Sequence, residues 1–122
     1  MNDLSAFVGK PWHPASNGPD AFDCWGLTRA ASLALFGRTL PDLPETWQVC
    51  DVVDAPVGWV EVDTPIPGAV IALGNYAGAI KHVCLSLGEQ RVLNTGRTVG
   101  AHIGSLATLR NIYPTVRFYV WP

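Results

Sequence analysis

The apolar residues change their spacing along the chain, from a helical repeat in the first third to short strand-like runs in the second half. In "DCWGLTRAASLALFG" small and apolar side chains recur at the spacing of one helix face: Leu27, Ala30, Ala31, Ala34 and Leu35. Asp23 precedes this run as a candidate N-cap, and Gly37 follows it as a candidate C-terminal stop. These signals predict a helix from about residue 23 to 36.

The second half of the chain predicts a sheet. Short runs rich in β-branched and aromatic residues are separated by turn residues there: 58–62, 68–73, 79–87, 90–95, 98–103 and 115–121. They predict an antiparallel meander of five or six strands. A short helix is also expected over Met1–Val8, ending at Gly9, and another over Glu45–Val53. Helices followed by strands predict one α+β domain over residues 1–122, with N-terminal helices packed on the sheet.

Composition narrows the class of protein. The chain of 122 residues is 48% hydrophobic and only 15% charged, which is typical of a folded domain rather than a disordered one. Its net charge of −2, without a basic cluster, argues against a nucleic-acid partner. No apolar run approaches the roughly 18 residues needed to span a bilayer. The first residues lack the pattern of a signal peptide, so we expect any action outside the cytoplasm to need another delivery route.

The cysteines do not form a recognisable framework. Cys24, Cys50 and Cys84 are odd in number and contain no CxxC pair, which argues against a disulfide scaffold or a zinc ribbon. Cys50 has no motif around it and is interpreted as structural, and Cys84 as a small buried residue. A metal site of Cys24, His82 and Cys84 is conceivable, but its spacing is unfamiliar, and we expect no metal or cofactor.

Cys24 occupies a position that suits a nucleophile. A cysteine in the first turn of a helix lies near unpaired amides and the positive end of the helix dipole, which stabilise a thiolate. A nearby imidazole would lower the thiol pKa further, and the same amides could stabilise an oxyanion. Position alone also suits a purely structural cysteine, so a general base has to be found elsewhere in the chain.

His82 and Asn94 are the candidate partners. Strand alternation places Ile80, His82, Cys84 and Ser86 on one side of their run, opposite a more apolar side, so His82 is expected to face a cleft or a helix. Asn94 lies on the next predicted strand, where it could accept from the imidazole and select its tautomer. Asn94 as an ordinary strand-end residue, and His102 as the orienting group, remain alternatives.

An ordered set of motifs resembles the NlpC-type cysteine peptidases, bacterial cell-wall hydrolases of the papain-like superfamily. The motifs "GKPW", "FDCWGL", "PGAVIAL", "HVCLSLG" and "RVLNT" occur in the order of that family between Gly9 and Thr95. The resemblance implies a papain-like fold in which Cys24 is the nucleophile, His82 the general base and Asn94 the orienting residue. The step from His82 to Asn94 is 12 residues, as the family pattern has it.

Some positions depart from the family pattern. Trp12 stands where the family often has a tyrosine, which keeps an aromatic wall but removes the phenol O–H, and Ala15-Ser16 replaces a Gly-Gly pair. Trp25, directly after the cysteine, resembles the phage-tail and prophage-associated branch. Asp23 is interpreted first as the helix cap, and the tryptophans Trp25, Trp47, Trp59 and Trp121 as core or cleft-wall residues.

The resemblance implies hydrolysis of peptidoglycan stem peptides through a thioester, typically at the D-γ-glutamyl–diaminopimelate bond. Trp12, Asp23, Trp25 and Arg97 are the expected substrate or oxyanion surroundings, with Arg97 meeting a substrate carboxylate. For the phage-like branch the partners would be tail proteins, and the location a virion tail or the cell wall. The alternatives are a tail structural or assembly protein with little activity, and an amidase or acyltransferase acting on another substrate.

Overall fold

The computed structural model describes residues 4–41 and 58–122. Three helical segments are present there: η1 (Leu4–Ala6), α1 (Cys24–Phe36) and α3 (Leu106–Ile112). The six strands are β1 (Val60–Val62), β2 (Val70–Gly74), β3 (Ile80–Gly88), β4 (Arg91–Asn94), β5 (His102–Ser105) and β6 (Thr115–Val120). The α+β class is confirmed, whereas the predicted helix over Glu45–Val53, with Trp47 and Cys50, lies outside the described residues. Within these residues no helix is long and apolar enough to cross a bilayer.

Local capping explains where α1 begins and ends. The Gly26 N–H donates to Asp23 Oδ1 (2.5 Å), and Gly37, at φ 68°, donates its N–H to the Leu33 carbonyl (3.0 Å). Both predicted caps are therefore confirmed. Gly26 also lacks room for a side chain, because a Cβ there would lie 2.1 Å from the Ser16 carbonyl oxygen. The loop before α1 thus packs directly on its first turn.

The buried face of α1 differs from the prediction. Leu27, Ala31 and Leu35 are buried as expected, but Ala34 is exposed. Two polar residues of α1, Thr28 and Ser32, are buried instead. Thr28 tolerates burial because its hydroxyl donates to the Cys24 carbonyl (2.8 Å), which satisfies its polar atom within the helix. The spacing of small and apolar residues therefore predicted where the helix lies. It did not predict all of the residues that the helix buries.

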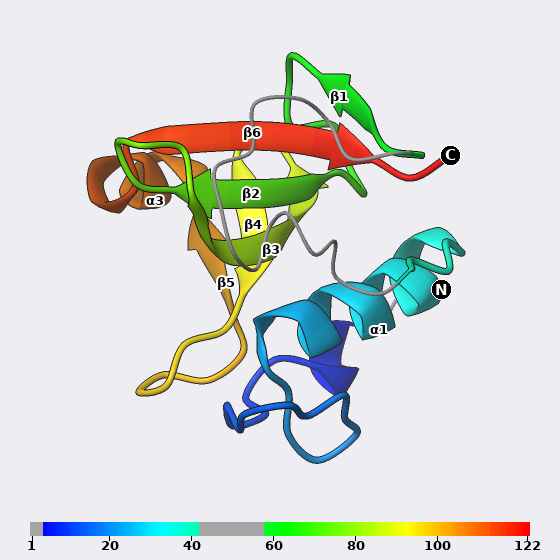
Figure 1. Ribbon diagram of the computed structural model, residues 1–122. Coiled ribbons are helices and arrows are strands. Elements are labelled where there is room, and N and C mark those ends of the chain that lie inside the picture. The colour runs from blue at the N-terminus through cyan, green and yellow to red at the C-terminus, as the bar shows by residue number, and fades with distance from the viewer. Residues whose placement is uncertain (1–3, 42–57) are drawn as a thin grey trace.

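The sheet is antiparallel and has the order β1-β6-β2-β3-β4-β5. Strands β2 to β5 form the predicted meander, but the prediction was wrong for the last strand. Figure 1 shows β6 (red) between β1 and β2, where Val70 pairs with Tyr119 and Val60 with Val120. Helix α3, which was not predicted, leads into β6, and Ser105 caps it by accepting from the Ala107 N–H (3.2 Å).

The two helices cover opposite faces of the sheet (Figure 1). On one face, Leu27, Ala31 and Leu35 of α1 pack against Leu85 and Leu93. On the other face, Leu106 and Leu109 of α3 join a second buried cluster that includes Ile71, Cys84 and Val92. Burying a leucine of this kind contributes about 1.5–3 kcal/mol. Both helices are therefore fixed to the sheet by apolar packing.

A bulge near the start of β3 changes which side chains share a face. Leu73 pairs with His82, but its neighbour Gly74 pairs with Ile80, so Lys81 is an extra residue in the ladder. Ile80 consequently packs with the Val83 cluster on the α1 side. The prediction that Ile80 and His82 share a face is wrong for this reason.

Candidate active site

A pocket of about 370 Å³ lies where the first turn of α1 meets the start of β3 and the end of β4. Five residues singled out from the sequence line it: Trp12, Cys24, His82, Asn94 and Arg97. The other lining residues are Lys81, Thr95, Gly96, Leu109, Ile112 and Tyr113. The pocket therefore brings a thiol from the start of α1 together with an imidazole and an amide from two neighbouring strands. The expectation that His82 faces a cleft is confirmed.

The bond between His82 and Asn94 selects the tautomer of the imidazole. His82 Nε2 lies 2.5 Å from Asn94 Oδ1, and the Thr95 backbone N–H donates to the same oxygen (2.9 Å). Since a backbone N–H can donate only to an acceptor, this atom is the amide oxygen rather than the nitrogen. His82 must then carry its proton on Nε2, and Nδ1 retains a lone pair for accepting a proton.

Cys24 is the first residue of α1, and its thiol is half-buried. Burial raises the pKa of this thiol above its ordinary value of 9.0, whereas the backbone N–H of Val83 and amides of the first helical turn lower it. The nearby Asp23 carboxylate raises the Cys24 pKa further. The thiolate-stabilising amides expected at a helix start are therefore present, but loss of solvation outweighs them.

Burial acts on His82 in the opposite sense. It lowers the pKa of the imidazole below 6.5, a shift that the hydrogen bond from Asn94 reduces and the nearby His102 increases. The raised thiol pKa and the lowered imidazole pKa each favour the neutral form of the group. The two groups line the same pocket, and the thiol proton would have to move during reaction.

Trp12 and Arg97 come from two loops that meet at the pocket. The Arg97 guanidinium lies 4.9 Å from the centre of a Trp12 ring, within the range of a cation–π contact. Backbone bonds hold the loops together, because Gly9 donates to the Ala101 carbonyl (2.8 Å) and Ala101 to the Lys10 carbonyl (2.9 Å). Lys81 also lines the pocket and no carboxylate does, so the pocket lining carries positive charge.

Two residues expected around the substrate do not line the pocket. Asp23 is the helix cap, and the Trp25 ring is buried against Trp59, with ring centroids 6.2 Å apart. Trp25 is therefore a core residue, and its backbone N–H lowers the pKa of the Cys24 thiol. His102 pairs with Asn94 across the β4–β5 ladder, but its Nδ1 faces the Gly100 carbonyl (2.9 Å) and it does not line the pocket.

The sequence analysis missed Tyr113, which lies at the end of α3. Its ring is stacked on His82, with centroids 6.1 Å apart and planes inclined by 12°. The signal that could have revealed this residue is the run "SLATLRNIYP", in which Ser105 is a helix cap and Pro114 a stop.

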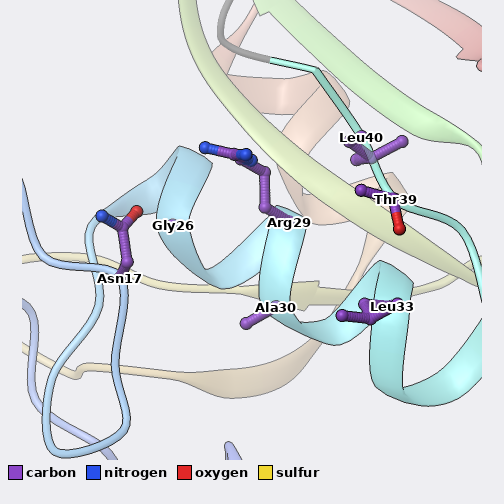
Figure 2. A pocket seen from close by; sticks show the side chains of 7 residues that line it. All are labelled: Asn17, Gly26, Arg29, Ala30, Leu33, Thr39 and Leu40. Atoms are coloured by element: carbon purple, nitrogen blue, oxygen red, sulfur yellow. The ribbon is translucent and has the colours of Figure 1, made fainter.

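A second pocket, of about 330 Å³, lies along α1 (Figure 2). Figure 2 shows Arg29, Ala30 and Leu33 projecting from α1, with Asn17 and Leu40 on the flanking segments. Its lining contains neither a cysteine nor a histidine, unlike that of the pocket with Cys24. No three His, Cys, Asp or Glu side chains of residues 4–41 and 58–122 are grouped as a metal site would require.

Comparison with protein families identifies one match. A family model described as the NlpC/P60 family matches residues 9–118. Comparison with curated proteins finds no significant match.

Solved structures share the fold. The NlpC/p60 domain of the peptidoglycan hydrolase SagA is 20% identical, with a TM-score of 0.56 over 93% of this chain and 87% of that one. A Staphylococcus aureus subsp. aureus Mu50 protein, described as similar to a lipoprotein of the NLP/P60 family, is also 20% identical, with a TM-score of 0.61 over 93% of this chain. NlpC1 from Trichomonas vaginalis is 15% identical, with a TM-score of 0.66 over 96% of this chain. The alignments cover only 37% and 42% of the last two chains.

Proposed function

Because the chain belongs to the NlpC/P60 family, we propose that it is a cysteine peptidase that hydrolyses amide bonds of peptidoglycan stem peptides. Membership of this family supports cell-wall hydrolase activity. One observation carries the assignment of residues: Cys24, His82 and Asn94 line a single pocket, and His82 presents Nδ1 as its free base because Asn94 binds Nε2. Cys24 is the nucleophile, His82 the general base and Asn94 the group that orients it.

Acylation begins when the Cys24 thiol attacks the carbonyl carbon of the scissile amide. As the S–C bond forms, the thiol proton moves to Nδ1 of His82, and the carbonyl oxygen becomes an oxyanion. The backbone N–H groups of Cys24 and Trp25 face the Cys24 sulfur, and they stabilise this charge at the positive end of the helix. The imidazolium then protonates the leaving amine as the C–N bond breaks, which leaves a thioester.

Deacylation repeats the same proton path with water. His82 Nδ1 removes a proton from a water molecule as its oxygen attacks the thioester carbonyl. The second tetrahedral intermediate collapses, the C–S bond breaks, and the imidazolium returns its proton to the Cys24 sulfur. The products are a free carboxylic acid and the original thiol, so no cofactor is consumed.

The positive charge of the pocket lining suits a substrate with a carboxylate near the cleaved bond. Arg97, held over Trp12, and Lys81 line the pocket, and neither forms an ion pair with another described residue. Stem peptides carry such carboxylates, and the bond we propose is the one between D-γ-glutamate and diaminopimelate. A guanidinium is well suited to hold a carboxylate through two parallel hydrogen bonds.

We also propose that the chain acts as part of a phage tail that opens the wall locally. The support is the tryptophan after the nucleophile, Trp25, which resembles the phage-associated branch of the family. An antibody against the chain should label tail tips of particles produced by the source strain. Labelling of the cell envelope alone would contradict the tail assignment without affecting the peptidase.

Incubation with purified muropeptides tests the activity. We expect the protein to release fragments cut at the γ-glutamyl bond, identified by mass spectrometry, and the Cys24→Ala protein to release none. The Cys84→Ala protein is the matched control, because it removes a thiol that lies outside the pocket lining. No cleavage by the unaltered protein would favour a structural tail role, and turnover of a different amide or an ester would favour the amidase or acyltransferase.

A further inference from the structure

Tyr113 forms part of one wall of the Cys24 pocket, although no family motif in the sequence points to it. It is half-buried, and Leu109 and Ile112 of α3 lie beside it in the pocket lining. Its ring lies nearly parallel to the imidazole of His82, at 6.1 Å between centroids and 12° between planes. No described residue forms a hydrogen bond with its hydroxyl, so within this part of the chain Tyr113 meets His82 through its ring.

The backbone on both sides of Tyr113 is held in place. Its N–H closes α3 by donating to the Leu109 carbonyl (2.8 Å), and the Leu109 side chain is buried in the core beneath the helix. Two residues further on, the Thr115 hydroxyl donates to the Asn75 carbonyl (2.8 Å) where β6 begins. The ring is therefore presented to His82 by two elements that are each fixed independently.

His82 has one side chain that binds it and one that covers it. Asn94 bonds Nε2, whereas Tyr113 stacks on the imidazole in an offset, nearly parallel arrangement. We propose that Tyr113 is a positioning residue, whose ring covers the imidazole of His82 and keeps it aligned with Asn94. This role rests on the proposed function, since it serves His82 as the general base.

The Tyr113 ring also limits the contact of the His82 imidazole with water. Burial is the main cause of the lowered pKa of His82, so a side chain that exposes the ring should raise this pKa toward 6.5. The other titratable or charged groups around the pocket come from several elements: Cys24 from α1, Lys81 from β3, Arg97 from a loop and His102 from β5. All of them are unchanged by substitution at Tyr113, so a shift reports on the ring.

The test compares Tyr113→Phe, which keeps the ring, with Tyr113→Leu, which removes it. Tyr113→Met is a second ring-free variant of greater length, should the leucine protein fold poorly. Tyr76→Leu is the matched control, since Tyr76 is 94% exposed and does not line the pocket. The His82 pKa is measured by NMR titration of the ring signals, assigned with His82→Gln, and kcat and KM are measured on muropeptides.

We expect Tyr113→Phe and Tyr76→Leu to stay within about twofold of the unaltered protein in kcat. Tyr113→Leu or Tyr113→Met should raise the His82 pKa and lower kcat about tenfold, with KM changed far less, because misorientation of a catalytic group slows the chemical step. An unchanged His82 titration in both ring-free variants, or an equal loss of kcat in Tyr113→Phe, would overturn the proposal. If the unaltered protein cleaves no muropeptide, the proposed function fails, but the NMR titration still decides the role of Tyr113.

Discussion

The hydrogen bond of His82 to Asn94 gives the two histidines near the pocket different roles. Replacing His82 by alanine should lower kcat on muropeptides by about 10²- to 10⁴-fold, the usual contribution of a general base. Replacing His102 by alanine should leave kcat within about twofold, because its Nδ1 faces the Gly100 carbonyl and it does not line the pocket. Equal losses in the two variants would show that His102 takes part in the reaction.

The neutral thiol of Cys24 leads to a specific pH dependence. Its pKa is raised above 9.0, so the thiolate fraction at pH 7 is small and grows as the pH rises through and beyond 9. The rate at which iodoacetamide alkylates Cys24, followed by mass spectrometry, should therefore still be increasing at pH 9. A rate that is already constant between pH 5 and 8 would instead indicate a preformed thiolate–imidazolium pair.

At the level of elements, the Asp23 side chain caps α1 and also places a negative charge near the Cys24 thiol. Asp23→Ala removes the acceptor for the Gly26 N–H and should lower the free energy of unfolding by about 1 kcal/mol, measured by denaturant titration. Asp23→Asn keeps an acceptor but removes the charge, which is one cause of the raised Cys24 pKa. The Asp23→Asn protein should retain most of the stability, and iodoacetamide should alkylate its Cys24 faster at pH 8. Loss of stability equal to that of Asp23→Ala would contradict the capping role.

The elements that could be predicted are those whose signals are local. Asp23 and Gly37 bracket α1 in the sequence, and a short hairpin connects His82 to Asn94. The bounds of α1 and the pairing of His82 with Asn94 could therefore be predicted from residues close together in the sequence. The bulge at Lys81 could not be predicted, because it depends on pairing with β2 rather than on β3 itself. Tyr113 was missed for a related reason: its helix is seven residues long, too short for a clear apolar period.

For the whole molecule, the buried thiol of Cys84 makes stability sensitive to alkaline pH. Burial raises its pKa above 9.0, and the side chain is only 1% exposed. The folded protein therefore keeps a proton that the unfolded chain releases above about pH 9, so stability is present below that pH and is lost as the pH rises. Between pH 9 and 11 this group should lower the free energy of unfolding by about 1.4 kcal/mol per pH unit.

Denaturant titrations at pH 8, 9, 10 and 11 measure this slope. The Cys84→Ala protein should show a slope that is shallower by about the same amount, whatever its stability at pH 8. The slope is compared rather than the absolute value, because a smaller side chain also leaves a cavity. Identical slopes in the two proteins would mean that Cys84 does not control alkaline stability.

The α+β class and the order of the strands along the chain could be predicted from composition and periodicity, but the place of β6 could not. Its pairing with β1 and β2 joins residues about fifty positions apart, and no local pattern reports such a contact.

The position of β6 has a consequence for the biosynthesis of the protein. Until residues 115–120 have left the ribosome, β2 has an unpaired edge and β1 has no partner in the sheet. Tyr113 lies just before this strand, at the end of α3. The nascent chain therefore completes its sheet only after β6 has been added. Before β6 pairs, the open strand edges are the sites at which chaperones bind or aggregation begins.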